Sequence, residues 1–141
     1  MNLSTPLLSA LLGSTLVFAS CTSSPDEITM QDAQGNYITT SDFHSMARYE
    51  FFDAMEAGLR DFDNQVAELR SRANSLGGEA LGEFADCEDE LMEKRTDFES
   101  QMVIAQNALD EDWADERSET VEAYVDLREA LSEAYEEVLD Q

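Results

Sequence analysis

The segment FFDAMEAGLRDFDNQVAELRSRANSLGG, residues 51–78, decides the fold of this chain. Large apolar side chains recur in it at alternating intervals of three and four residues. The series is Phe52, Met55, Leu59, Phe62, Val66, Leu69, Ala73 and Leu76. A seven-residue repeat with two apolar positions places these side chains on one narrow stripe of an α-helix. The glycine pair at 77–78 is typical of a helix C-terminus and the turn that follows it.

Two further apolar stripes with the same spacing follow the glycine pair. The first is Leu81, Phe84, Glu88, Leu91, Arg95, Phe98, Met102, Ala105 and Leu109. The second is Trp113, Arg117, Thr120, Tyr124, Leu127, Leu131, Ala134 and Val138. Residues 107–112 between them hold neither Gly nor Pro, but the stripe slips by one residue there, and Asp110 or Asp112 is a suitable N-cap. We predict a break at this point; the alternative is one kinked helix over 79–140.

Three amphipathic helices of similar length, joined by short turns, bury their stripes best against one another. We therefore predict an all-α fold, an antiparallel three-helix bundle or coiled coil over residues 42–141. The expected helices cover about 42–76, 79–109 and 113–140, and Ser41 or Asp42 is the expected first N-cap. Residues 21–41 have no helical period, and we predict a flexible, disordered polar tether with a brief extended stretch at 36–40.

Polar residues interrupt the second and third stripes. Glu88, Arg95, Arg117 and Thr120 stand at positions that the spacing assigns to the core. Buried polar groups need hydrogen-bonding partners or a route to solvent. These four positions either set the register of the helices or mark a stripe that is completed by a second subunit.

The N-terminal segment carries an apolar run at residues 7–18, which is too short to span a bilayer, and then the residues Phe18-Ala19-Ser20-Cys21. This junction resembles the lipobox of bacterial lipoproteins. The resemblance implies removal of residues 1–20 as a signal peptide and attachment of fatty acyl chains, such as palmitate, to Cys21. It also implies a protein anchored by lipid in the cell envelope, at the outer membrane where the cell has two. The alternatives are a secretory signal cut after Ser20 and a buried strand.

The charge of the chain is strongly negative. It has 32 Asp and Glu against 8 Lys and Arg, a formal net charge of −24 at pH 7, and the acids are spread along every segment from Asp26 onward. This composition resembles that of halophilic proteins, since surface carboxylates repel one another less when salt shortens the Debye length. The alternative is an acidic interaction surface. Either way, binding to nucleic acid or to anionic lipid headgroups is excluded, because both need a basic face.

The sequence holds no recognisable catalytic, cofactor or metal site. Its one histidine, His44, is expected on the surface near the start of the first helix, and no nucleophile-elbow sequence accompanies it. No Glu-x-x-His pair, EF-hand loop or glycine-rich phosphate loop is present. Once Cys21 is acylated, Cys87 is a lone thiol, either a small buried apolar residue or a partner for an intermolecular disulfide.

These features predict a function without catalysis. We expect a non-enzymatic cell-envelope lipoprotein that acts as a helical spacer or protein-interaction module, with no cofactor and no metal. Its expected partners are the membrane, through the lipid, and an envelope protein or a second copy of the chain. The alternative is a lipid-anchored, chaperone-like or ligand-binding module with a groove between the second and third expected helices.

Overall fold

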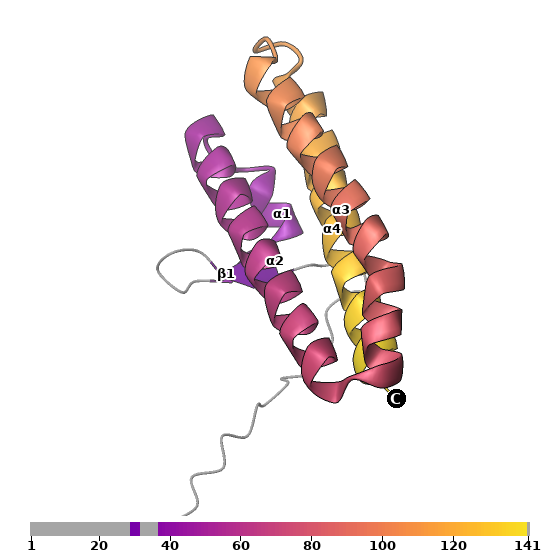
Figure 1. The fold of residues 1–141 in the computed structure, drawn as a ribbon. Coiled ribbons are helices and arrows are strands. Elements are labelled where there is room, and N and C mark those ends of the chain that lie inside the picture. The colour runs from indigo at the N-terminus through magenta and orange to yellow at the C-terminus, as the bar shows by residue number, and fades with distance from the viewer. Residues whose placement is uncertain (1–28, 32–36, 141) are drawn as a thin grey trace, which may run out of the picture.

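The structure is a computed structural model that describes residues 29–31 and 37–140 (Figure 1). In chain order its elements are β1 (Thr29–Gln31), β2 (Tyr37–Thr39), α1 (Thr40–Phe43), α2 (Arg48–Leu76), α3 (Gly78–Asn107) and α4 (Trp113–Leu139). The all-α antiparallel bundle predicted from the three stripes is confirmed. The break between the second and third helices is also confirmed, because α3 ends at Asn107 and α4 begins at Trp113.

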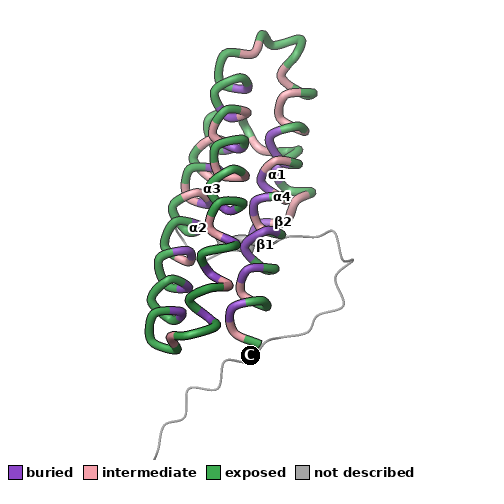
Figure 2. Tube along the Cα trace, turned by 45° about the vertical axis from the view of Figure 1, so that its right-hand side comes forward, coloured by how far each residue is buried: buried purple, intermediate pink, exposed green. Residues whose placement is uncertain are grey.

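The three long helices run alternately down, up and down along one common axis (Figure 1). Antiparallel α3 and α4 contact each other along their length: Gln101 binds Glu116 near one end, and Cys87 binds Glu137 near the other. The bundle therefore has two distinct ends. One, which we call the α3–α4 end, carries the turn at residues 108–112. The other, the α2–α3 end, carries the turn at Gly77 and the C-terminal end of α4 (Figure 2).

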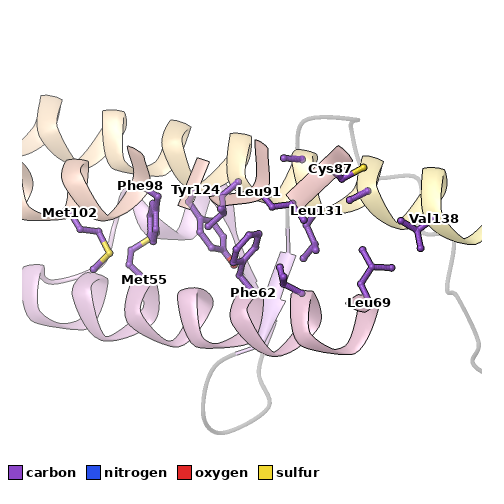
Figure 3. Close-up of a cluster of buried hydrophobic side chains, with 14 of the residues drawn as sticks. Met55, Phe62, Leu69, Cys87, Leu91, Phe98, Met102, Tyr124, Leu131 and Val138 are labelled. Carbon is purple, nitrogen blue, oxygen red and sulfur yellow. The ribbon is translucent and has the colours of Figure 1, made fainter. Parts of the chain in front are cut away.

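The core is a continuous row of side chains enclosed by α2, α3 and α4 (Figure 3). Phe62, Leu69, Phe98, Tyr124 and Leu127 are fully buried. Burying a large apolar side chain contributes about 1.5–3 kcal/mol relative to leaving it exposed, so this row supplies most of the favourable free energy of the bundle.

The apolar stripes differ from the sequence-based prediction at their edges. Three leucines assigned to the core are exposed: Leu76 and Leu109 at 63% and Leu81 at 43%. Small residues elsewhere face inward, namely Ala80 and Cys87 in α3 and Gly58 in α2. The spacing of large apolar residues misses these positions, because an inward-facing Ala, Cys or Gly has no large apolar side chain to mark it.

The predicted first helix does not start at Ser41 or Asp42. The short helix α1 begins one residue after Thr39, whose backbone N–H and hydroxyl both bind Asp42 Oδ2 at 2.8 Å, which lowers the pKa of Asp42. The chain then leaves helical geometry. Ala47 has an extended backbone conformation, and α2 begins at the next residue, Arg48. This interruption redirects α1 into the space between α2 and the other two long helices (Figure 1).

Phe43 of α1 fills that space. It is 0% exposed, and its ring makes edge contacts with Phe51 of α2 and Tyr124 of α4, both with centroids 6.2 Å apart. Helix α2 leans away from α3 and α4 toward its N-terminus (Figure 1). The contacts of Phe43 with Phe51 and Tyr124 place its ring between α2 and α4. The ordered domain therefore begins before residue 42.

The predicted tether also contributes to the domain. Strands β1 and β2 form an antiparallel pair in which Met30 lies opposite Ile38, and Ile38 is buried at 8% exposure. The prediction of a flexible tether up to residue 41 is therefore wrong for residues 37–41, since an apolar side chain from this stretch packs on the helical core. Residues 1–28 and 32–36 lie outside the described residues.

Candidate functional site

The predicted lipid-attachment residue, Cys21, lies outside the described residues, so the acylation of its sulfur stays a prediction. His44 is described, and it is exposed at the C-terminal cap of α1, as the sequence predicted. Its ring has no recorded contact with a nucleophile or a carboxylate in the described part of the chain.

Cys87 lies on α3 with its sulfur turned toward α4. The thiol is 9% exposed and donates a hydrogen bond to Glu137 Oε2 at 2.9 Å. Burial, followed by the hydrogen bond to Glu137 and the charges of Glu137, Glu83 and Glu90, raises the pKa of Cys87 to about 12. A thiol held protonated in this way is a poor nucleophile, because thiolate is the reactive form. The buried-residue interpretation of Cys87 fits this environment better than an intermolecular disulfide does.

Three of the four polar positions within the stripes have partners, whereas the buried Nε of Arg117 has no hydrogen-bond partner among the described residues, and the Arg117 guanidinium lies 5.7 Å from the centre of the Trp113 ring. Arg95 Nε and Nη2 bind the two carboxylate oxygens of Asp63 at 2.7 and 2.9 Å, and these bonds raise the pKa of Arg95. Glu88 pairs with Arg70 of α2. Thr120 is buried and donates to the Glu116 carbonyl of its own helix at 2.7 Å. Arg95 and Glu88 thus connect α3 to α2 within one chain, which favours the register role over completion by a second subunit.

Arg48 joins the start of α2 to the end of α3. Its Nη2 donates to the carbonyl oxygens of Ala105 and Ala108 at 2.9 and 2.8 Å, and to a third at Gln106 at 3.2 Å. The guanidinium also lies 4.7 Å from the centre of the Trp113 ring. The last carbonyls of a helix have no partner within the helix, and its C-terminus carries a partial negative charge. A cation from α2 therefore satisfies the end of α3.

The aromatic run on α4 is part of the packing. Tyr124 is fully buried, and its hydroxyl has no hydrogen-bond partner among the described residues. It lies against Gly58 of α2, where an added Cβ would come within 2.7 Å of Tyr124 Cε2. Trp113 contacts Phe51 and Arg48, and Tyr135 donates to the Gln65 carbonyl at 3.1 Å. No ring of this run is free to serve as a stacking platform.

The α2–α3 end carries an apolar hollow. Its volume is about 360 Å³, and it is lined by Leu76, Gly77, Gly78, Glu79, Ala80 and Leu139. Gly77 has φ of +69°, a conformation that L-residues rarely adopt, and Gly78 follows with φ of +52°. The tight turn that these glycines allow leaves Leu76 on the surface.

An acidic groove adjoins this hollow and shares Glu79 with it. The groove has a volume of about 600 Å³ and is lined by Glu79, Glu83, Glu136, Glu137 and Asp140. Neither α2 nor α4 has a basic residue in its last turn. The α2–α3 end thus combines exposed apolar surface with a concentration of negative charge, and it is the candidate interaction site.

Within residues 29–31 and 37–140, no group of three or more His, Cys, Asp or Glu side chains is arranged to hold a metal ion. No helix among these residues is long and apolar enough to cross a membrane.

Comparison of this chain with family models, with curated proteins and with solved structures finds no match.

Sequence reasoning missed the residues that define the two ends of the bundle. Arg48 stands just before the first apolar stripe, and nothing in the spacing connects it with carbonyls 57–60 residues later. Leu76 was assigned to the core because it continues the stripe. Its exposure could have been anticipated from its position directly before two glycines, where the helix has ended and no partner helix covers the last turn.

Proposed function

We propose that this protein is a non-enzymatic lipoprotein of the cell envelope, anchored by acyl chains on Cys21, whose helical bundle acts as a spacer and protein-interaction module. Its setting is the membrane surface, facing the periplasm or the exterior. The strongly acidic composition suits an environment of high salt.

The observation that carries the proposal is the junction Phe18-Ala19-Ser20-Cys21 after an uncharged apolar run. A single acyl chain holds a protein at a membrane only reversibly, whereas two or three hold it stably. The negative charge of the domain would repel it from anionic lipid headgroups. With stable attachment through Cys21, the domain does not need to bind those headgroups.

The bundle has the dimensions and surface of a spacer with an interaction site. Helix α3 alone has 30 residues, which corresponds to about 45 Å of helix length. Exposed large apolar side chains occur on α2 and α3, including Leu76 at 63% and Val103 at 56%. Apolar groups left exposed on a highly charged surface are candidate contacts for a partner protein.

A chaperone-like or ligand-binding role through a groove between α3 and α4 has less support. The space beside Cys87 at this interface has a volume of about 20 Å³, room for about one water molecule. The open α2–α3 end has more room for a bound group than this closed interface.

Replacing the acylated cysteine tests the proposal directly. We expect Cys21→Ala to remove palmitate labelling and to move the full chain from the membrane fraction to the soluble fraction. Cys87→Ala is the matched control, since it removes the other cysteine and should keep both the label and the membrane attachment. A Cys21→Ala chain that still sediments with membranes would contradict lipid anchoring at this residue.

A further inference from the structure

The α2–α3 end, which carries the hollow and the acidic groove, differs from the rest of the surface in the helix termini that meet there. Helices α2 and α4 both end here, so two C-termini present carbonyl groups and partial negative charge at one place (Figure 2). The N-terminus of α3 offsets one of them, but Glu79 already occupies the first turn of that helix. At the opposite end of the bundle, the single C-terminus, that of α3, is satisfied by Arg48.

Neither C-terminus at the α2–α3 end has a basic residue of its own. No Lys or Arg occurs in the last turn of α2 or of α4, whereas five acidic side chains line the adjoining groove. The nearest ion pair on α3 joins Glu88 to Arg70, and neither residue lines the hollow or the groove. The negative potential of this end is therefore left for an external cation to neutralise.

The apolar residues that form the floor of the hollow restrict which kinds of cation can bind well at this end. The side chains of Leu76, Ala80 and Leu139 line the hollow beside the carboxylates. A simple metal ion gains nothing from an apolar floor, and a polyamine has only its thin methylene chain to place there. A peptide segment that presents Lys or Arg beside a Leu or similar side chain uses both parts, since the apolar group fills the hollow and the cations lie along the groove.

The chain itself cannot supply such a segment. Residues 1–47 contain no Lys or Arg, so the part that precedes α2 is not basic. A second copy is a poor occupant as well, because each copy carries a net charge of −24 and most of its arginines are engaged with carboxylates of their own chain. The occupant must come from a different protein.

We propose that the α2–α3 end is a docking site for a basic amphipathic segment of a partner protein, with the apolar hollow receiving an apolar anchor and the carboxylates of Glu79, Glu83 and Glu136 receiving its cations. The proposal deepens the interaction role given above and rests on it. Partners of this site carry a Lys- or Arg-rich helix or strand terminus with at least one large apolar side chain.

A binding titration tests this site with the full chain in nonionic detergent. The probe is a fluorescein-labelled synthetic amphipathic helix of Leu and Lys, about four turns long. Its binding is followed by fluorescence anisotropy at the lowest NaCl concentration at which circular dichroism shows full helicity. Detergent micelles alone give the background. A peptide with Ser in place of Leu reports the purely electrostatic part.

Two variants of equal charge distinguish the site from diffuse attraction. Glu79→Gln/Glu83→Gln/Glu136→Gln removes three carboxylates at the α2–α3 end, and Glu111→Gln/Glu119→Gln/Glu122→Gln removes three exposed ones elsewhere. We expect the first to weaken binding at least about tenfold and the second less than about twofold. Leu76→Ser, at a side chain already 63% exposed, should weaken the Leu/Lys peptide about fivefold and leave the Ser/Lys peptide unchanged.

Equal losses in the two charge variants, or no effect of Leu76→Ser, would overturn the proposal and leave only nonspecific attraction of a cation to an acidic protein. Failure of the Leu/Lys peptide to bind would overturn it too. Binding in detergent does not depend on the acyl chains, so release of the Cys21→Ala chain from membranes and failure of this site are separate results.

Discussion

The α3–α4 hairpin and helix α2 reach the same core in different ways. Helices α3 and α4 are neighbours in the sequence, joined by residues 108–112, and they lie side by side along their whole length (Figure 1). Helix α2 leans away from them toward its N-terminus. The ring of Phe43 lies between α2 and α4, and Arg48 connects the start of α2 to the end of α3. Contact along the whole length holds the hairpin together, whereas the N-terminal part of α2 depends on individual long-range contacts.

This difference has a physical origin. Residues 108–112 between α3 and α4 and Gly77 between α2 and α3 both close short loops at small entropic cost, so what sets α2 apart is its contact with α4. Helix α2 contacts α4 across 67 and 70 residues of sequence, through the pairs Asp61 with Arg128 and Gln65 with Tyr135. Each of these contacts stabilises the fold only if it outweighs the conformational entropy lost when its own side chains become ordered. We therefore expect substitutions at the α2 contacts to have sharply position-dependent effects.

Phe43→Ala should have the largest effect. The ring is fully buried against both α2 and α4, so its removal leaves a cavity where the helices diverge. We expect a loss of about 3–5 kcal/mol in the free energy of unfolding, measured by urea denaturation followed by circular dichroism. Phe52→Ala, at a half-buried ring, should cost less than half as much. Equal small losses would mean that α1 is not part of the cooperative core.

Arg48→Met should have the next largest effect. The variant keeps the apolar stem but leaves the carbonyls of Ala105 and Ala108 without their donor. We expect a loss of about 2 kcal/mol, because hydrogen bonds to a charged donor contribute more than neutral ones. Arg60→Met is the matched control, since Arg60 forms only an exposed pair with Glu56 at 3.9 Å and should change stability by less than about 0.5 kcal/mol. Similar losses in the two variants would exclude Arg48 as a link between α2 and α3.

A pair of glycine substitutions compares the two regions directly. Gly58→Ala places a Cβ within 2.7 Å of the Tyr124 ring, whereas Gly82→Ala on α3 meets nothing within 4 Å. Alanine favours a helix over glycine by about 1 kcal/mol, so Gly82→Ala should stabilise the protein. Gly58→Ala should destabilise it by about 1–2 kcal/mol, because the clash outweighs that gain. Opposite signs in thermal unfolding support close approach of α2 to α4; stabilisation by both substitutions contradicts it.

The contrast between hairpin and α2 also explains what could be predicted from the sequence. The fold class, the three long helices and the break after Asn107 follow from a local period that any amphipathic helix must satisfy. The inward placement of Phe62, Leu69 and Leu127 follows in the same way. Interruption of the first helix at residues 44–47 did not follow, because no Gly or Pro marks it. It arises from the burial of Phe43 against α4, which is a tertiary contact.

The candidate interaction site was less accessible to sequence reasoning. The acids of the α2–α3 end, such as Glu79 and Glu136, look like any others in a chain with 32 Asp and Glu. Their significance depends on which helix termini meet there, and thus on the up-and-down topology. Leu76 continued the stripe by spacing, yet it is exposed, because the turn at Gly77 follows immediately. A periodic pattern identifies the face of a helix but not whether a partner covers its last turn.

The smallest expected effect concerns Cys87 and tests the closed α3–α4 interface. Burial raises its pKa to about 12 in the folded protein from an ordinary value of 9.0, so the unfolded chain releases the proton first as the pH rises. The stability that comes from the protonated thiol is complete below about pH 9 and is lost between about pH 9 and 12. Because carboxylates and solvent lie nearby, we expect the whole loss across this range to stay below about 1 kcal/mol.

Cys87→Ala isolates this contribution from the tyrosines that titrate in the same range. The difference in unfolding free energy between the two proteins should shrink as the pH rises above 9 and stay constant below it. At neutral pH, a thiol reagent should modify the native Cys87 far more slowly than the urea-unfolded chain. Rapid modification of the native protein would mean that α3 and α4 separate easily at this point. The contrast drawn above would then reverse, with the hairpin and not α2 as the looser part of the bundle.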